Sequence, residues 1–283
     1  MLSTDDLEYK WDFVASPVPR WRYRQRLSSL YGRICRQPQF SELITLGPKT
    51  DWAVYFAYLP DGRLTAAHRF TLGRLRDMNL NVFVVCAADE VSDVPDELRR
   101  YSDALYWKQL RGYDFSAYTL ALNVISRKSP HARVFFLNDS VFGPFRELRE
   151  KIFDAPWDLT GFTASSQIEN HIQSYAFSIA DVTAQRVARL RPVLFPFVSL
   201  NHADAVILCQ ETRLARVASR SMSVGSYWYA DAEKVIDPTL ARPFQLLEAG
   251  FPFLKKSLVG KHMKFEAADA ARQFLAEESH PLV

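Results

Sequence analysis

The sequence predicts an α/β protein with a single, mostly parallel sheet flanked by helices. Between residues 51 and 137, apolar runs of strand length alternate with segments whose apolar residues recur at helical spacing. Two strands joined by a helix of this length need a right-handed crossover, so neighbouring strands are expected to be parallel. The chain has 283 residues, of which 48% are hydrophobic and 24% charged, and this is typical of a globular protein with a large core.

The first predicted strands are nearly continuous apolar runs, as expected for strands buried on both faces. The turn Pro60-Asp61-Gly62 follows the first of them and leads into a helix. The predicted strands are residues 53–58, 82–86, 104–107 and 134–137, and the helices between them are residues 64–78, 96–101 and 115–126.

The second half of the chain alternates less regularly. Asp181 is placed to cap a helix through its carboxylate. Residues 50–262 are expected to form the main domain, and residues 263–283 a loosely packed C-terminal tail. The elements predicted in this half are strands at 157–162 and 174–179, the second with its direction left open, and helices at 145–153, 182–190 and 202–219.

Residues 1–49 are predicted to form a basic N-terminal appendage with a helix that ends near Gly32. One interpretation is peripheral contact of residues 20–36 with an anionic membrane or another polyanion. The other is a solvated helix whose arginine stems cover aromatic rings. This stretch contains no acidic residue and six arginines, which are Arg20, Arg22, Arg24, Arg26, Arg33 and Arg36.

Charge and cysteine content exclude several classes of protein. The chain has 35 basic and 32 acidic residues, a net charge of +3, which gives no indication of a nucleic-acid partner. Cys35, Cys86 and Cys209 have neither metal-ligand spacing nor the even number of a disulfide framework, which favours a reducing compartment. The sequence has no apolar run of about 18 residues and no secretory signal after Met1. We therefore expect a cytoplasmic protein without a membrane span.

The most informative segment follows the predicted strand 134–137. That strand ends abruptly in the polar run Asn138-Asp139-Ser140, and Gly143-Pro144 then forces a turn. The carboxyl end of a buried strand is where α/β sheets bind ligands. A carboxylate there is suited to a divalent cation that bridges it to the phosphates of a nucleotide diphosphate. The alternative is that Asp139 only caps the following turn.

A second polar segment, residues 108–116, follows a predicted strand and opens a helix. Gly112 allows a positive φ or a close approach of the backbone, and Asp114 stands at the expected N-cap. Arg111 lies just before the positive end of that helix, which is a good arrangement for holding a phosphate. The alternative is a plain capped helix with a surface arginine.

Two further segments hold candidate polar groups. Residues 167–175 place seven hydrogen-bonding side chains before a strand, which suits either a solvated loop with a structural His171 or a sugar-binding rim. Glu211 lies in a helix that is otherwise apolar or basic, so its carboxylate is a candidate general base. An ion pair with Arg213 or Arg216 is the alternative for Glu211.

Three residues near the C-terminal end of the sequence are also candidate site residues. Lys255 or Lys256 could reach a phosphate, unless both are simply solvated, and His262 is a candidate metal ligand. Several familiar motifs do not occur: Gly-x-Gly-x-x-Gly, the phosphate loop, Gly-x-Ser-x-Gly and His-Glu-x-x-His. Their absence disfavours a dehydrogenase, an NTPase, a serine hydrolase and a zinc protease.

In combination, these segments resemble the rhamnan synthesis protein F family of glycosyltransferases over about residues 50–260. The most specific element is Asn-Asp-Ser-Val-Phe-Gly-Pro-Phe at residues 138–145. Where glycosyltransferases of the GT-A fold carry Asp-x-Asp, this chain has Asn138 and Ser140 around Asp139. The other matching segments support the resemblance through their order and spacing, and they are residues 58–62, 111–115, 171–175 and 250–255.

The resemblance implies a GT-A-like fold and transfer of a sugar, rhamnose by the family name, from a nucleotide-sugar donor. The acceptor would be a growing cell-surface polysaccharide or lipopolysaccharide, which could be linked to a lipid. The reaction would take place at the inner face of the cell membrane. Mn²⁺ or Mg²⁺ would be the cofactor, with Asp139 and His262 as candidate ligands. Donor binding is implied for Arg111, Gly112, Asp114, Asn138, Asp139 and Ser140, and sugar or acceptor binding for His171, Gln173, Tyr175 and Lys255.

The sequence leaves the stereochemistry and one alternative function open. An inverting reaction needs a carboxylate to deprotonate the acceptor hydroxyl, with Glu211 the first candidate and Asp61 the second, whereas a retaining reaction needs none. The alternative function is a non-catalytic module of the same fold that binds a glycan or a nucleotide sugar in a polysaccharide assembly complex. The single acidic residue between Asn138 and Ser140 keeps this alternative open.

Overall fold

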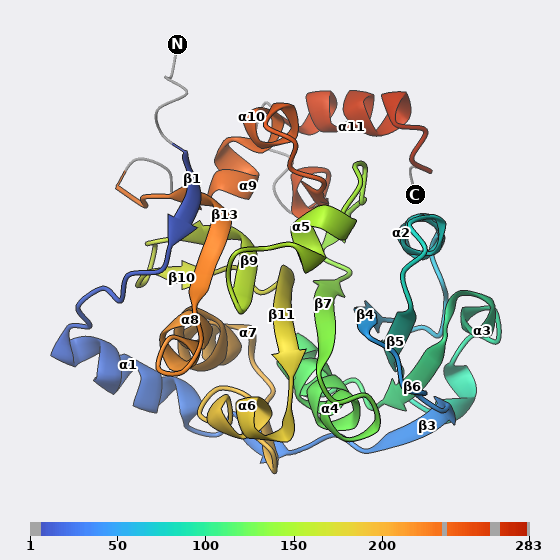
Figure 1. The fold of residues 1–283 in the computed structure, drawn as a ribbon, viewed down its shortest axis with the longest axis horizontal. Coiled ribbons are helices and arrows are strands. Elements are labelled where there is room, and N and C mark those ends of the chain that lie inside the picture. The colour runs from blue at the N-terminus through green and yellow to red at the C-terminus, as the bar shows by residue number, and fades with distance from the viewer. Residues whose placement is uncertain (1–6, 234–236, 261–266, 282–283) are drawn as a thin grey trace.

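The computed structural model describes residues 7–233, 237–260 and 267–281. Its centre is a ten-stranded sheet in the order β1-β13-β9-β11-β7-β4-β5-β6-β3, with β10 paired to β9. In Figure 1 the sheet crosses the molecule from β1 on the left to β3 on the right. The strands are β1 (Glu8–Asp12), β3 (Phe40–Ile44), β4 (Asp51–Tyr58), β5 (Val82–Ala87), β6 (Ala104–Lys108), β7 (Ala132–Asn138), β9 (Leu159–Ser165), β10 (His171–Ile172), β11 (Ala176–Val182) and β13 (Val224–Ala230).

The sheet confirms the predicted α/β class and its mostly parallel character. β4, β5, β6, β7, β9 and β13 run in one direction, whereas β1, β3, β10 and β11 run in the other. The chain lays β4, β5 and β6 side by side and then returns to place β7 on the other side of β4. The strand order therefore reverses between β4 and β7, and a switch point of this kind opens a ligand crevice at the carboxyl ends of the strands.

Helices cover both faces of the sheet, and successive strand residues alternate between two apolar cores. Val54 and Phe56 belong to the core under α4, whereas Tyr55 and Ala57 belong to the core under α2. Figure 1 shows α4, α6 and α8 below the sheet and α2, α5 and α10 above it. The helices are α1 (Arg20–Leu30), α2 (Ala66–Asp77), α3 (Leu98–Tyr101), α4 (Tyr113–Lys128), α5 (Arg149–Phe153), α6 (Ala184–Arg189), α7 (Ala203–Val206), α8 (Thr212–Ala218), α9 (Pro238–Ala241), α10 (Pro243–Glu248) and α11 (Ala267–Glu277).

The N-terminal segment contains the predicted helix, and it also supplies both edges of the sheet. β1 pairs with β13 at one edge, and β3 pairs with β6 at the other. A separate ribbon joins β2 (Ile34–Arg36) to β12 (Val198–Leu200). A second ribbon joins β8 (Val141–Phe142) to β14 (Leu254–Lys255). The predicted domain boundary between residues 49 and 50 stays a prediction. β1 and β3, which precede it, belong to the same sheet as the strands that follow it.

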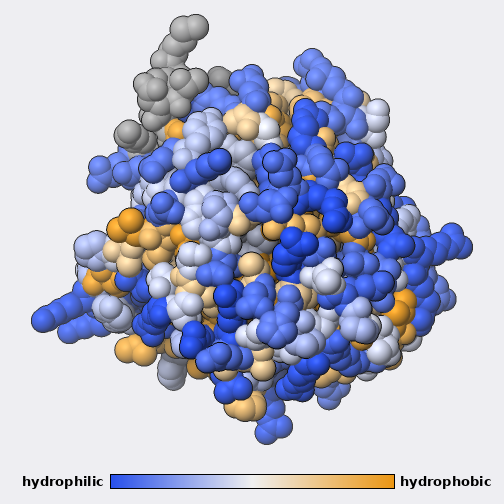
Figure 2. All heavy atoms as spheres, in the orientation of Figure 1, coloured by the Kyte–Doolittle hydropathy of each residue, from blue (hydrophilic) through white to orange (hydrophobic). Residues whose placement is uncertain are grey.

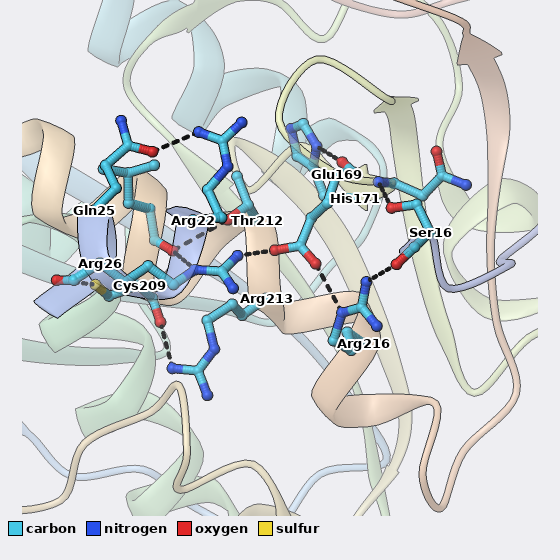
Figure 3. A network of polar contacts seen from close by, with 12 residues as sticks. Ser16, Arg22, Gln25, Arg26, Glu169, His171, Cys209, Thr212, Arg213 and Arg216 are labelled. Carbon is cyan, nitrogen blue, oxygen red and sulfur yellow. Dashed lines mark hydrogen bonds and ion pairs between the residues drawn. The ribbon is translucent and has the colours of Figure 1, made fainter. Parts of the chain in front are cut away.

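A buried ion network holds α1 against the rest of the molecule (Figure 3). The Glu169 carboxylate accepts from Arg26 on α1 and from Arg216 on α8, at 2.7 Å for the Nε of Arg216. Arg216 also donates to the carbonyl oxygen of Ser16. Only 1% of the Glu169 side chain is exposed, so this network lies inside the protein. The alternative that Glu211 pairs with Arg213 or Arg216 is wrong, because Arg216 pairs with Glu169 and Arg213 donates to the carbonyl oxygen of Cys209.

Several local predictions need correction. The N-cap of α6 is Thr183 and not Asp181, which has a φ of 54° and pairs with His131. The predicted helix 202–219 is one helical run interrupted by the π-helical turn η3 (Ile207–Glu211) between α7 and α8. The predicted loose C-terminal tail is wrong for its described part, because Ala271 and Leu275 of α11 are buried against Phe142 and Phe145. Throughout the described ranges, no helix is both long and apolar enough to cross a membrane.

Candidate functional site

Asp139 lies at the point where the strand order reverses. It follows the last residue of β7, and its Oδ2 accepts a hydrogen bond at 3.0 Å from the backbone N–H of Tyr58, the last residue of β4. The same oxygen lies 3.3 Å from Nε2 of His68 on α2. The side chain is 21% exposed. One carboxylate oxygen is therefore fixed across the switch point, and within the described part of the chain the other has no hydrogen-bond partner.

The protonation of His68 follows from its other contact. The backbone N–H of Thr65 donates to Nδ1 of His68 at 3.1 Å, so Nδ1 is the acceptor. The ring proton of the neutral imidazole is therefore on Nε2, which donates to Asp139. Thr65 and His68 form the capping box that begins α2. The first turn of α2 thus helps to orient Asp139, a role for His68 that sequence reasoning missed.

Asn138, and not Asp139, caps the turn after β7. The Asn138 Oδ1 accepts from the backbone N–H of Ser140 at 3.1 Å and from its Oγ at 2.6 Å. Its Nδ2 donates to Oδ2 of Asp114 at 2.9 Å. Both ends of the amide are therefore used inside the protein. The capping role considered above for Asp139 therefore belongs to Asn138. The Asp139 side chain does not cap the turn and remains partly exposed.

Asp114 lies in the first turn of α4 and is linked to Asn138. Gly112 is the N-cap of this helix, so the predicted N-cap role of Asp114 is wrong. The Asp114 Oδ1 accepts from the backbone N–H of Phe115 at 2.9 Å. Burial raises the pKa of Asp114 to about 6, with a further rise from Glu211 and an opposing effect of the hydrogen bonds from Asn138 and Phe115. This carboxyl therefore changes its charge near neutral pH.

We expect the Asp114→Asn variant to gain stability relative to the wild type as pH rises. The folded protein binds the Asp114 proton more tightly than the unfolded chain, so wild-type stability falls as pH increases toward about 6. The variant does not titrate there, so its free energy of unfolding relative to wild type should rise by about 2 kcal/mol between about pH 4.5 and about pH 7.5. Urea unfolding at several pH values measures this. A difference that is constant with pH would contradict the buried carboxyl.

The Gly112 backbone conformation brings this loop close to its neighbours. Gly112 has a φ of +90°, and its N–H donates to the Oδ1 of Asn201 at 3.4 Å. A Cβ at this position would lie 2.7 Å from the Oγ of Ser116 and 2.9 Å from the Cβ of Ser199. The prediction of a positive φ or a close backbone approach is therefore confirmed on both counts.

We expect Gly112→Ala to lower the free energy of unfolding by about 1–3 kcal/mol, because alanine is strained at positive φ and its methyl group meets two side chains. The matched control is Gly73→Ala in α2, where a Cβ meets nothing within 4 Å. That change should stabilise the protein by about 0.5–1 kcal/mol. Urea denaturation of both variants compares them, and an equal effect of the two changes would contradict the strain argument.

A second cluster gathers around Lys255. Its Nζ lies 3.9 Å from the ring centroid of Tyr175. Burial lowers the pKa of Lys255, while the carboxylates of Asp237, Glu211 and Asp114 raise it. Glu211, the last residue of η3, accepts from the backbone N–H of Ser174 at 2.9 Å. The π-helical turn thus directs this carboxylate toward the candidate site, and such turns are frequent at functional sites.

Gln173 and Tyr175 extend this cluster toward β9. The Oγ1 of Thr163 lies 2.5 Å from Oε1 of Gln173 and 2.6 Å from the Tyr175 hydroxyl. The Gln173 Nε2 donates to Oδ2 of Asp237 at 3.2 Å. The predicted residues Glu211, Gln173, Tyr175 and Lys255 are therefore brought together, although they are far apart in the sequence.

The other predicted site residues lie outside these two clusters. Asp61 is exposed in the turn after β4, where it accepts from the backbone N–H of Arg63. Arg111 is exposed, and its guanidinium donates to Gln109. His171 is buried, with its Nδ1 2.7 Å from the carbonyl oxygen of Glu169 (Figure 3). His262 lies outside the described residues.

The described residues fit a divalent cation only through Asp139. Among them, no group of three or more His, Cys, Asp or Glu side chains is arranged to hold a metal ion. Mg²⁺, however, is commonly bound by one or two carboxylates together with water and substrate phosphates. The unpartnered oxygen of Asp139 suits such a site, whereas the protonated Nε2 of His68 does not offer a ligand. A bound cation there would neutralise charge on a diphosphate.

Comparison with known proteins finds limited similarity. No protein-family model matches the chain. Two relatives, both named virulence protein VirA and both from Vibrio anguillarum, are 28% identical over 128 residues, which is 44% of this chain and 41% of each relative. The chain thus spans about two-fifths of the length of the curated relatives it matches.

Two solved structures are similar in part. The inositol-1-phosphate CTP transferase from T. maritima has a TM-score of 0.40 and 11% identity, covering 72% of this chain and 97% of that one. S. aureus TarS 1–349 has a TM-score of 0.38 and 12% identity, covering 78% and 74% respectively. Likeness at this level carries no argument about activity. The α/β fold rests on the sheet topology, and the resemblance to rhamnan synthesis protein F stays a prediction.

Proposed function

We propose that this protein is a glycosyltransferase that binds a nucleotide-sugar donor at the carboxyl ends of β4 and β7. The observation that carries the proposal is the Asp139 carboxylate at the point of strand reversal. Its Oδ2 is fixed by Tyr58 and His68, while the other oxygen is available to a ligand. Asp114 is joined to this segment through Asn138, and we also assign Arg111 and Gly112, at the start of α4, to the proposed donor site.

Sugar transfer needs stabilisation of the departing diphosphate and activation of the acceptor hydroxyl. In our proposal the diphosphate lies near Asp139, with Mn²⁺ or Mg²⁺ as the group that neutralises its charge. Arg111 is the proposed side chain for phosphate contact. Glu211 is the proposed base of an inverting reaction, and Asp61 is the second candidate. Lys255, Gln173 and Tyr175, together with His171, are the proposed contacts of the sugar or acceptor.

The proposed acceptor is a cell-surface polysaccharide or lipopolysaccharide under assembly, as in the rhamnan synthesis F family that the sequence resembles. Rhamnose as the donor sugar and the inner face of the cell membrane as the location are parts of the same proposal. The basic, aromatic surface of α1 supports peripheral contact with anionic lipid. Trp21 and Tyr23 on this helix are each 56% exposed, and Leu27 is 70% exposed.

Donor binding and donor hydrolysis test the proposal. A panel of nucleotide sugars is titrated with Mn²⁺ or Mg²⁺, first by thermal shift and then by calorimetry. For the donor that binds, we expect Asp139→Asn to weaken affinity about tenfold or more and to abolish slow hydrolysis, because a cation held there would lose the carboxylate of Asp139. Asp77→Asn, an exposed carboxylate at the last residue of α2, should leave both unchanged.

The outcomes separate the two candidate functions. Donor binding that depends on Asp139, with neither hydrolysis nor transfer by the wild type, would favour the non-catalytic module of the same fold. Binding and hydrolysis that are unchanged in Asp139→Asn would contradict the proposed site. Correct folding of each variant is checked by its melting temperature without ligand.

A further inference from the structure

A cavity of about 470 Å³ lies between α4, β6 and the edge strand β3. In Figure 1, α4 lies at the lower end of the molecule between α6 on one side and β6 and β3 on the other. The volume is within the range of small-molecule sites. Neither Asp139 nor Glu211 lines it, so the cavity is separate from the chemistry proposed above.

The wall of the cavity is mostly apolar. Phe40 on β3, Leu120 and Val124 on α4, and Phe197 before β12 contribute to it. Phe40 is 56% exposed and Phe197 is 83% exposed, so apolar surface also continues outside the cavity. The face of the molecule shown in Figure 2 is mostly hydrophilic, with apolar side chains exposed in small separate groups. Exposed aromatic residues beside an apolar cavity indicate a ligand with a hydrocarbon portion.

Cations without acidic partners line the same cavity. In the described part of the chain, the side chains of Arg127 and Arg191 form no ion pair and no hydrogen bond. By contrast, Lys128 pairs with Glu42 at the same wall. Two guanidinium groups without ion pairs beside one small cavity suit a phosphate, because each can donate two parallel hydrogen bonds to its oxygens.

Lys108 is a buried residue that also lines the cavity. It is 1% exposed, and its Nζ donates to the carbonyl oxygens of Gln109 and Arg111, both at 2.8 Å. An ammonium group has three N–H bonds, so a protonated Lys108 keeps one for another acceptor. The same side chain that lines the cavity therefore also supports the loop of Arg111.

We propose that this cavity binds the phosphorylated end of a lipid. The phosphate would contact Arg127 and Arg191, and the chain would lie against Phe40, Leu120 and Val124. A nucleotide would also offer a phosphate and a flat apolar ring. The lipid is favoured because the apolar surface extends from the cavity to side chains that are largely exposed, as at Phe197. This inference stands apart from the proposed donor site.

Calorimetry with octyl phosphate tests the proposal without any donor or activity assay. We expect octyl phosphate to bind the full chain at least about tenfold more tightly than either octanol or inorganic phosphate, since only octyl phosphate has both the chain and the charge. The double variant Arg127→Gln/Arg191→Gln should lose about tenfold or more in affinity for octyl phosphate. Val124→Trp, which fills the cavity without changing charge, should produce a similar loss.

The control is Arg100→Gln/Arg220→Gln, which removes the same charge from exposed positions on α3 and after α8. Its affinity for octyl phosphate should match that of the wild type. Absence of octyl phosphate binding by the folded wild type would overturn the proposal. So would equal losses in the two double variants, or unchanged binding in Val124→Trp. An AMP titration covers the nucleotide, and binding tighter than that of octyl phosphate would also overturn the lipid assignment.

Discussion

Glu211→Gln is expected to lower the turnover of sugar transfer by about 10²–10⁴-fold, the usual contribution of a general base. Glutamine keeps an oxygen that can accept the backbone N–H of Ser174, which now bonds Glu211 at 2.9 Å. The local structure should therefore survive while the basic group is lost. Steady-state kinetics with the donor and acceptor identified by the binding screen would measure the effect, and calorimetry should find donor affinity within about threefold of wild type.

The comparison with Asp61→Asn identifies the base. Asp61 is exposed in the turn after β4, where its carboxylate accepts only a local backbone N–H. If Glu211 is the base, the loss in Asp61→Asn should stay below about tenfold. A large loss of turnover in Asp61→Asn alone would identify Asp61 as the base. Small losses in both variants would contradict base catalysis by either carboxylate and would indicate a retaining reaction.

Glu169→Gln is expected to lower the free energy of unfolding by about 3–5 kcal/mol, because it leaves two arginines without their carboxylate inside the protein. The side chain of Glu169 is 1% exposed, and those of Arg26 and Arg216 are 9% and 25% exposed. Their network joins α1, the segment before β10 and α8 (Figure 3). Urea denaturation followed by circular dichroism measures the change.

The matched control for Glu169→Gln is Glu97→Gln. Glu97 pairs with Arg69 near the surface, where their side chains are 31% and 45% exposed. Water screens this pair, so we expect a much smaller loss of stability. Equal losses in the two variants would show that burial of the Glu169 network adds no stability. The comparison holds the chemical change constant and varies only the surroundings of the carboxylate.

The sequence predicted the central strands well because each of them is a buried apolar run. β4, β5, β6 and β7 were all expected, each within a few residues of its observed ends. β13 was missed, since Gly225 interrupts its pattern. The structure gives the reason for this glycine: a Cβ there would lie 2.1 Å from the Trp157 ring. β1 was also missed, because its Glu-Tyr-Lys-Trp-Asp sequence is mostly polar and forms a strand only beside β13.

The sequence predicted those site residues that are marked by a short local motif. Asp139 and Asp114 stand at strand and helix ends that can be located from the sequence. The contact of His68 with Asp139 depends on how α2 packs against β4 and β5, which no short motif records. Lys108 was not singled out, because lysine is rarely buried. In the structure burial lowers the pKa of Lys108 to about 7, with Asp114 opposing this change.

The pairing of β1 with β13 has a consequence for how the protein is made. Glu8 lies opposite Tyr229, so β1 can find its partner only after the much later strand β13 has been synthesised. Until then the β9 edge of the growing sheet stays open, because β13 covers it and β1 in turn covers β13. Contacts so distant in sequence form slowly. Nascent chains should therefore depend on chaperones during this interval, and a restraint that keeps β1 away from β13 should reduce the yield of native protein.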